Sequence, residues 1–221
     1  EQGMAGRVGV GYTAGAGSMV LGEILTQLRA RLPAVAIDLY EMVTSEQLAA
    51  LENGQLDIGF GRLSADIPDV EATSFRRERL VLAAPQGHHL LVKTTPLLRA
   101  EIRNHELLMH SPVKARYLYD LIVRHFPVDH SQVAYQLSQI STMVSLVASN
   151  LGLAVVPESA ALHRHAGVGF RAFDDLASPV AEISMMHRPS SDNPAARRAW
   201  KLLLDSIRST YYTQAALIDT K

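Results

Sequence analysis

Cysteine is absent from this 221-residue sequence. Its absence excludes disulfide bonds, thiolate metal ligands and a cysteine nucleophile. No apolar run approaches the roughly 18 residues of a membrane span, and residues 1–7 do not show the charged-then-apolar pattern of a signal peptide. We therefore expect a cytoplasmic protein that does not bind membranes.

A basic excess is missing as well, because the formal net charge is −1. Proteins that bind nucleic acids by themselves usually carry such an excess, since they neutralise phosphates. DNA is therefore not expected as a direct partner of these residues. The chain is 48% hydrophobic and 19% charged, which is typical of a folded chain with a sizeable core, in one large domain or two small lobes.

The first part of the chain alternates between strand-like and helix-like segments. The spacing of apolar residues over Met19–Leu32 predicts a helix with Ser18 as its cap, after a loop at Gly15 and Gly17. Thr44 with Gln47 three residues later is a capping-box pattern and predicts the start of a second helix. Strands are predicted at Arg7–Tyr12, Val35–Tyr40, Leu56–Phe60 and Leu80–Ala84. This βαβαβ order favours a parallel sheet with right-handed crossovers.

The second part begins after a predicted turn at Pro85–His89. Ser111 followed by Pro112 predicts a helix start, because serine suits the cap and proline the first helical position. The other predicted elements are strands at Leu107–His110, Val133–Leu137, Leu153–Val156 and Val180–His187, and helices at about Ser141–Ser149 and Pro194–Tyr212. Both parts therefore indicate an α/β fold.

Small hydroxyl residues stand at four predicted helix starts: Ser18, Thr44, Ser111, and Ser138 or Ser141. In an open parallel sheet, ligands bind beside the loops that follow the strands, where helix N-termini offer N–H groups and partial positive charge. Several such termini around one cleft would hold a small carboxylate. Each hydroxyl taken alone is better explained as an ordinary helix cap. Arg62 is the best candidate for a charged partner, because guanidinium pairs bidentately with carboxylate.

Motifs for catalysis or cofactor binding are weak. Gly9-x-Gly11-x-x-Ala14 resembles a dinucleotide fingerprint, but its glycines fall inside a predicted strand. The pairs His88–His89 and His163-x-His165 have no carboxylate or cysteine beside them at metal-ligand spacing. The chain has no Gly-x-Ser-x-Gly motif of a hydrolase. We therefore expect no enzymatic activity, no cofactor and no metal site.

An ordered set of short segments carries a resemblance to a known family. It comprises Gly6–Gly11 as an opening strand, Leu28–Pro33 as a helix end, the spaced residues Thr44, Leu48, Leu51, Gly54, Leu56–Asp57 and Gly59, and Leu146–Pro157. Over residues 6–210 this set resembles the effector-binding domain of LysR-type transcriptional regulators. The stretch Asp57–Leu63 resembles the branch that senses muconate and related products of aromatic degradation. Three departures are His89, where the family often has proline, Asn150, where it often has glycine, and Gly15, where some members of the branch have serine.

The resemblance implies a two-lobed, periplasmic-binding-protein-like (type 2) architecture, with each lobe a mostly parallel sheet flanked by helices. We expect residues 1–84 with 180–221 to form one lobe and residues 85–179 the other, with the chain crossing near Ala84–Pro85 and Ala177–Val180. A muconate-like or aromatic carboxylate is expected in the cleft between the lobes. The expected effector-binding residues are Thr13, Gly15, Ser18, Thr44, Arg62, Ser111, Pro112 and Gln139.

The resemblance also implies partners. Effector domains of the family pair as dimers, and as tetramers in the full-length protein, with Val20–Leu32 of one chain expected against Ser111–Phe126 of the other. The start at Glu1 looks like a cut upstream of a strand, so we expect a longer protein whose N-terminal winged helix-turn-helix binds DNA and which contacts RNA polymerase. The alternative is a secreted solute-binding protein of a transport system, and an upstream helix-turn-helix would decide between the two.

Overall fold

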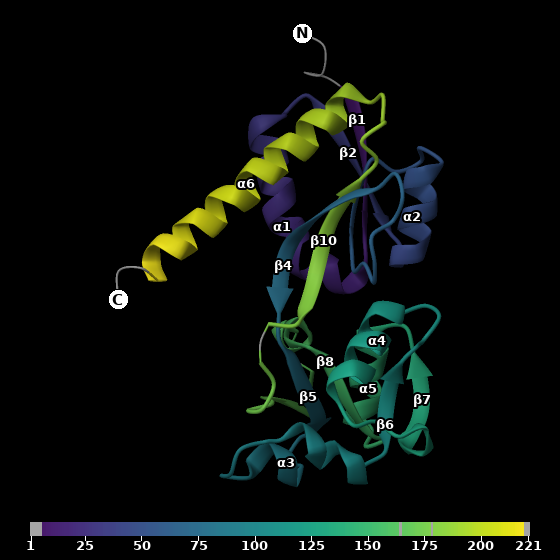
Figure 1. Ribbon diagram of the computed structural model, residues 1–221, viewed down its shortest axis with the longest axis vertical. Helices are drawn as coiled ribbons and strands as arrows, with labels where there is room; N and C mark the ends of the chain where they lie inside the picture. Colours follow the sequence, from purple (N-terminus) through teal and green to yellow (C-terminus); the bar gives the residue numbers. More distant parts are fainter. Residues whose placement is uncertain (1–5, 164, 178, 219–221) are drawn as a thin grey trace. The chain divides into compact units, whose positions relative to one another are not determined.

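The computed structural model describes residues 6–163, 165–177 and 179–218, with side chains up to Ile207. The chain divides into two compact units, residues 6–75 with 183–218 and residues 76–182. Each unit has its own five-stranded sheet with helices packed on it (Figure 1). The predicted α/β architecture of two sheets is therefore confirmed.

The sheet of the first unit has the strand order β2-β1-β3-β10-β4. Its elements are β1 (Gly6–Tyr12), α1 (Ala14–Arg31), β2 (Val35–Glu41), α2 (Thr44–Glu52), β3 (Ile58–Gly61), β4 (Glu71–Glu78), β10 (Ala181–His187) and α6 (Pro194–Ile218). Strand β1 pairs in parallel with β2 and with β3, whereas β10 runs antiparallel to β3. The sheet is therefore mixed rather than mostly parallel, because β10 returns from far along the chain in the opposite direction.

The sheet of the second unit has the strand order β7-β6-β8-β5-β9. Its elements are β5 (Leu80–Pro85), α3 (His89–Val92), η1 (Arg99–Asn104), β6 (Leu107–His110), α4 (Arg116–His125), η2 (His130–Gln132), β7 (Val133–Leu137), α5 (Ile140–Ala148), β8 (Leu153–Pro157), η3 (Glu158–Leu162) and β9 (Val168–Ala172). Strand β6 is parallel to β7 and β8, and β5 is antiparallel to β8 and β9. This sheet is also mixed.

The chain passes between the units within β4, after Phe75, and within β10, after Glu182. The sequence placed the first passage later, near Ala84–Pro85, because proline punctuates the chain there. Strand β5 instead belongs wholly to the second sheet, where five of its six residues are buried. Pro85 therefore marks the turn that leaves β5 and not the passage itself.

Each sheet buries an apolar core against helices. In the first unit, Val20, Ile24 and Leu28 of α1 are at most 1% exposed and pack with Trp200 and Leu203 of α6. In the second unit, one face carries the apolar side of α4 and the other that of α5. Each unit is therefore stabilised by the burial of apolar helix faces on its own sheet.

Two helix starts differ from the sequence prediction. Helix α1 begins at Ala14 with Thr13 as its N-cap, so Ser18 lies inside the helix. Of the two glycines that suggested a loop, Gly17 serves close packing instead, because a Cβ there would lie 2.7 Å from the Tyr12 ring. Helix α4 begins at Arg116, and Ser111–Pro112 opens a separate turn before it.

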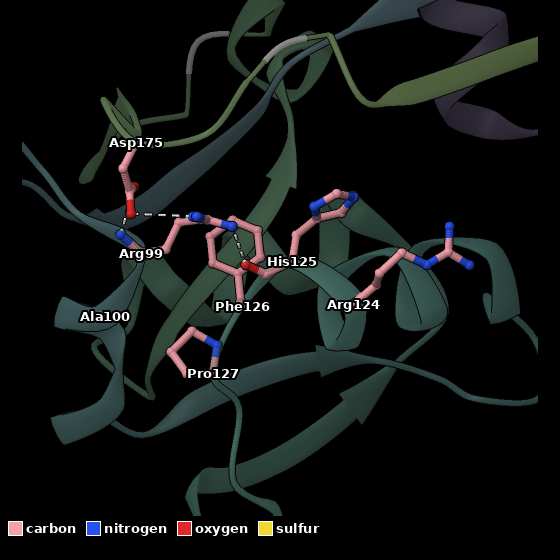
Figure 2. Close-up of a pocket in the computed structure, with 7 residues that line it drawn as sticks. All are labelled: Arg99, Ala100, Arg124, His125, Phe126, Pro127 and Asp175. Atoms are coloured by element: carbon pink, nitrogen blue, oxygen red, sulfur yellow. Dashed lines mark hydrogen bonds and ion pairs between the residues drawn. The ribbon is translucent and has the colours of Figure 1, made fainter.

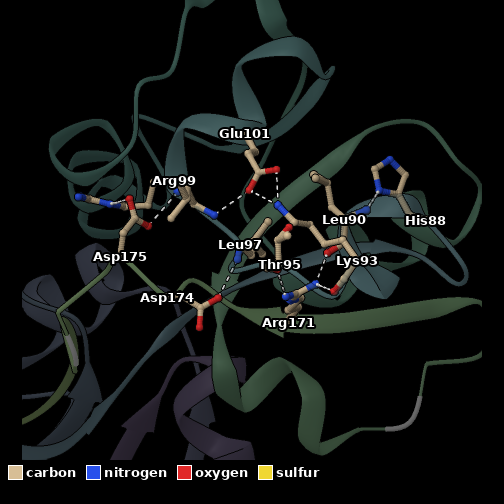
Figure 3. A network of polar contacts seen from close by, with 11 residues as sticks. His88, Leu90, Lys93, Thr95, Leu97, Arg99, Glu101, Arg171, Asp174 and Asp175 are labelled. Atoms are coloured by element: carbon tan, nitrogen blue, oxygen red, sulfur yellow. Dashed lines mark hydrogen bonds and ion pairs between the residues drawn. The ribbon is translucent and has the colours of Figure 1, made fainter.

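A polar network fastens the segment around residues 90–101 to the second sheet (Figure 3). The Arg171 guanidinium donates to the carbonyl oxygens of Leu90, Lys93 and Thr95 at 2.8–3.0 Å. The Lys93 ammonium lies 2.6 Å from a carboxylate oxygen of Glu101. The carbonyl oxygens of this irregular segment have no partners in a regular helix or sheet, and the Arg171 guanidinium supplies the donors that they need.

Candidate functional site

The carboxyl ends of β1, β2 and β3 meet at one edge of the first unit. There the backbone N–H of Thr13 donates to the Phe60 carbonyl oxygen at 3.1 Å, and the backbone N–H of Arg62 donates to the Thr44 hydroxyl at 3.1 Å. The structure therefore brings together three of the predicted site residues, Thr13, Thr44 and Arg62, around the end of β3.

The hydroxyl groups at this edge are used in different ways. Thr13 Oγ1 accepts from the Ala16 N–H at 3.2 Å, and Thr44 Oγ1 accepts from the Arg62 N–H. A hydroxyl that accepts still has its own hydrogen to donate. Ser18 differs, because its Oγ lies 3.1 Å from the Ala14 carbonyl oxygen, which only accepts, so Ser18 donates its hydrogen within the helix. Thr13 and Thr44 are therefore suited to donate to an anion and Ser18 is not.

Backbone N–H groups add to the positive character of this edge. Gly15 lies in the first turn of α1, where its N–H has no acceptor among the described residues. Helix α2 starts at the same edge, and its first-turn Glu46 carboxylate accepts from the Val43 N–H at 3.1 Å. First-turn N–H groups carry the positive end of the helix dipole. Gly15 therefore offers a backbone N–H without an acceptor among the described residues at this edge.

Gln47 positions this edge, a role that the sequence analysis missed. The sequence suggested a capping box, but Gln47 is fully buried and its Nε2 donates to the carbonyl oxygens of Met42 and Phe60 at 3.0 and 3.2 Å. It thus ties the loop before α2 to the end of β3. The available signal was glycine: a Cβ on Gly59 would lie 2.8 Å from Gln47 Oε1, so the strand must lack a side chain there.

The second unit has a comparable edge, at the carboxyl ends of β6 and β7. Ser111 N–H donates to the Leu137 carbonyl oxygen at 2.8 Å, and Ser111 Oγ accepts from the N–H groups of Val113 and Lys114 at 3.3 and 3.2 Å. Pro112 lies in the same turn. Gln139 is the N-cap of α5 but makes no side-chain capping bond. The Ser111 hydroxyl hydrogen and the Gln139 amide are therefore available at this edge.

Arg62 is 8% exposed and engaged in interactions of its own. It follows β3 directly, and its backbone position is fixed by Thr44. The predicted residues thus fall into two groups, Thr13, Gly15, Ser18, Thr44 and Arg62 in the first unit, and Ser111, Pro112 and Gln139 in the second.

A separate hollow of about 360 Å³ lies in the second unit, at the end of α4 (Figure 2). Its lining comprises Arg99, Ala100, Arg124, His125, Phe126, Pro127 and Asp175. The sequence analysis did not predict this feature, because its residues come from three segments far apart in the chain.

The histidines of the described residues were candidates for a metal site. The rings of His88, His89 and His105 lie 4.4–5.4 Å apart, centroid to centroid. Even so, no group of three or more histidines and carboxylates there is arranged to hold a metal ion. Gly9 and Gly11 lie within β1, as expected, and not in a phosphate-binding turn. None of the described helices is both long and apolar enough to cross a membrane.

Comparison with known proteins places this geometry in context. Residues 1–208 match the family described as LysR substrate binding domain. The chain is 29% identical over 216 residues to the probable cat1 operon transcriptional activator of Acinetobacter lwoffii, which covers 96% of this chain and 68% of that protein. It is 26% identical over 206 residues to the HTH-type transcriptional regulator CatR of Pseudomonas putida, covering 91% and 69%.

Solved structures show the same fold. The structure of the BenM effector binding domain with its effector benzoate superposes with a TM-score of 0.77 at 22% identity, covering 95% of this chain and 94% of that one. The reduced OxyR regulatory domain superposes with a TM-score of 0.76 at 24% identity, covering 93% and 98%. The arrangement of two mixed sheets flanked by helices is thus the one found in these regulatory domains.

Proposed function

This chain belongs to the LysR substrate binding domain family and is the effector-binding domain of a transcriptional regulator; we propose that its effector is a small organic acid, either muconate-like or an aromatic carboxylate. The observation that carries the proposal is the set of donors at the first edge. The hydroxyls of Thr13 and Thr44 each retain a hydrogen, and Gly15 adds a backbone N–H at a helix N-terminus. Donors of this kind stabilise a carboxylate.

The second edge holds a further set of candidate donors within its own unit. The Ser111 hydroxyl retains its hydrogen, and the Gln139 amide is not used for capping. Pro112 fixes the turn that holds Ser111. The benzoate effector named for the BenM domain, a protein of the same fold, supports the choice of an aromatic carboxylate.

Calorimetry on the purified chain tests the ligand class. We expect benzoate or cis,cis-muconate to bind and the corresponding neutral amides to bind much more weakly, because the donors match a carboxylate and not an NH₂ group. Ser111→Ala is expected to weaken binding if the second edge contacts the effector, whereas Ser131→Ala is the matched control on an exposed turn. Equal binding of acid and amide would contradict the proposal.

Recognition of this kind requires no catalysis. Neither edge combines a nucleophile with a base within hydrogen-bond distance among the contacts described above. We therefore propose that the effector leaves unchanged. Recovery of intact benzoate after prolonged incubation tests this, and a product whose formation stops in Thr44→Val would overturn it.

Self-association is the second part of the proposed function, because LysR regulators oligomerise. The apolar face of α1 that carries Leu28 is buried in its own core, so a partner must use the other face, where Leu25 is partly exposed. On α4 the corresponding exposed residue is Val123, at 49%. We expect Leu25→Glu to lower the dimer fraction in light scattering without unfolding the chain, and an unchanged dimer would rule out this face.

A further inference from the structure

The two strands in which the chain passes between the units, β4 and β10, are neighbours in one sheet. The second unit begins at Arg76 and ends at Glu182. The Arg77 guanidinium lies 3.0 Å from a carboxylate oxygen of Glu182, so an ion pair joins the two ends of this unit. The Arg77 side chain is 59% exposed, and an exposed ion pair of this kind holds two strands only weakly.

Helix α4 gives Glu182 a second and firmer partner. The Tyr117 hydroxyl accepts from the Glu182 backbone N–H at 2.8 Å. The Tyr117 ring is partly buried and packs on the same apolar core as Val180 and Ala181, which directly precede Glu182. Because the ring is held by this packing, the position of the hydroxyl follows that of α4.

The Tyr117 hydroxyl replaces a partner that the sheet does not supply. Strand β10 pairs with β3 from Ser184 onward, where Ser184 lies opposite Gly61, the last residue of β3. Glu182 lies two residues before that pair. An amide in a strand ordinarily donates to a neighbouring strand, and at Glu182 a side chain 65 residues away in the sequence accepts instead.

The start of α4 is held in turn by the Ser111–Pro112 turn. The Ser111 carbonyl oxygen accepts from the Ala115 N–H at 3.0 Å, and its Oγ accepts from the Lys114 N–H at 3.2 Å. Ala115 is the N-cap of α4 and makes no side-chain capping bond of its own, and Tyr117 is the second residue of the helix. The turn that carries the candidate donors of the second edge therefore sets the position of Tyr117.

We propose that Tyr117 is a positioning residue, which couples occupancy of the second edge to the point where β10 leaves the second unit. An effector that contacts the Ser111 turn stiffens the first turn of α4, and the Tyr117 hydroxyl transmits this change to the Glu182 N–H. All of these residues belong to the second unit. The ligand in this inference rests on the proposed function, whereas the link from Ser111 to Glu182 does not.

Residue-resolved hydrogen exchange on the whole chain without ligand tests the link. Tyr117→Phe keeps the ring and removes the acceptor, so we expect the Glu182 amide to exchange roughly fivefold faster. Ser111→Ala removes the acceptor of the Lys114 N–H and should also speed exchange at Glu182, by a smaller factor. In the double variant Ser111→Ala should add nothing at Glu182, because the only route proposed has already been cut.

Tyr119→Phe is the matched control on the same helix. Tyr119 is also partly buried on this core, but its hydroxyl makes no hydrogen bond with a described residue. Exchange at Glu182 should therefore remain as in the wild type. An unchanged Glu182 rate in Tyr117→Phe, an equal rise in Tyr119→Phe, or additive effects in the double variant would overturn the proposal.

Benzoate then tests the ligand-dependent part. We expect benzoate to slow Glu182 exchange in the wild type but not in Tyr117→Phe, while calorimetry shows an affinity within about threefold of the wild type in that variant. Slowing at Glu182 that persists in Tyr117→Phe would contradict the role of the hydroxyl. Absence of benzoate binding to the wild type would contradict the proposed ligand instead, and the double variant without ligand would still decide on the link.

Discussion

Helix α2 of the first unit and helix α5 of the second cover their sheets in different ways. Beneath α2 the strands carry Gly11, Gly59 and Gly61, and a Cβ at any of them would lie within 3 Å of a neighbouring side chain. Beneath α5 the strands carry Leu108, Ala154 and Val156, which pack on the apolar side of the helix. Glycine lets α2 come close enough for polar side chains to reach the strand backbone.

This difference in packing affects how firmly the candidate donors are held at the two edges. In the first unit, Thr44 and Gln47 are bonded to the backbone of β3 or its end, so their positions are fixed before a ligand arrives. In the second unit, Gln139 has no side-chain capping partner. Preorganised donors give affinity at low entropic cost, and adaptable ones fit ligands of different shape. The donors of the first edge are therefore preorganised, whereas those of the second edge are adaptable.

The largest effect is expected from Leu28→Glu. Leu28 is 1% exposed in the core of the first unit, and an unpaired carboxylate there should cost at least about 4 kcal/mol of unfolding free energy. Trp200, the single tryptophan, lies in the same core and reports on this unit by fluorescence.

The same variant tests whether the units are independent. Hydrogen exchange should remain slow in β6 and β8 of Leu28→Glu while protection is lost in β1 and β3. Leu39→Glu, at a position 42% exposed on β2, is the matched control and should remain folded. Loss of protection in both units of Leu28→Glu would mean that they fold as one.

Gly59→Ala tests whether glycine is needed for the close approach of α2 to its sheet. The new methyl group would lie 2.8 Å from Gln47 Oε1 and 3.0 Å from Met186 Cε, so we expect a loss of about 1–3 kcal/mol in urea unfolding. Gly22→Ala, on the exposed side of α1 with no atom within 4 Å of the new carbon, should instead stabilise by about 0.5–1 kcal/mol. If both variants behaved alike, close approach of α2 would not be the reason for glycine.

Acid should weaken the second unit more than the first. Burial lowers the pKa of His88, His105 and His125 below the ordinary value of 6.5, with neighbouring imidazoles or arginines adding to the effect. In the first unit only His187 among the described residues is lowered in this way, by burial and against the opposing effect of Glu71.

The direction follows from proton binding. Below pH 6.5 these imidazoles bind protons in the unfolded state, while in the folded state they stay neutral until the pH is lower. Their contribution to the free energy of unfolding is therefore fully present above pH 6.5 and is lost as the pH falls toward the folded pKa values. Unfolding followed by circular dichroism should therefore shift more with acid than unfolding followed by Trp200 fluorescence. His105→Gln should reduce that difference, and equal shifts by both probes would contradict it.

The smallest effect is expected from Ser18→Ala. The Ser18 hydrogen is donated to Ala14 within α1, so its removal should change effector affinity by less than about 0.5 kcal/mol in calorimetry. Thr13→Val, one turn earlier, should weaken binding because that hydroxyl keeps its hydrogen. A loss in Ser18→Ala as large as in Thr13→Val would show that the two hydroxyls are equivalent.

Sequence patterns predicted the buried elements better than the exposed ones. Strands such as Leu107–His110 stand out because they are mostly apolar and fully buried, whereas Glu71–Glu78 has one buried residue and gives no periodic signal. Helix α1 was predicted to start late because Gly15 and Gly17 suggested a loop, although Gly17 is needed against Tyr12.

Candidate site residues could be named only at the level of residue type. A hydroxyl before a helix is visible in the sequence, but the partner of its hydrogen depends on tertiary contacts. Thr44 therefore could be named, whereas its bond to the Arg62 N–H, 18 residues later, could not. The hollow at the end of α4 was missed for the same reason, since its lining comes from separate segments.

The most direct test of carboxylate binding at the first edge is the affinity of the preferred acid for Thr44→Val compared with Thr44→Ser, with Thr26→Val as an exposed control on α1. Serine keeps the hydroxyl, so it should bind nearly as the wild type does. Valine keeps the shape and loses the donor, so its binding should weaken by about 1–3 kcal/mol while the fold is retained. Wild-type affinity in a folded Thr44→Val would contradict this role, because Thr44 would then only hold the Arg62 backbone.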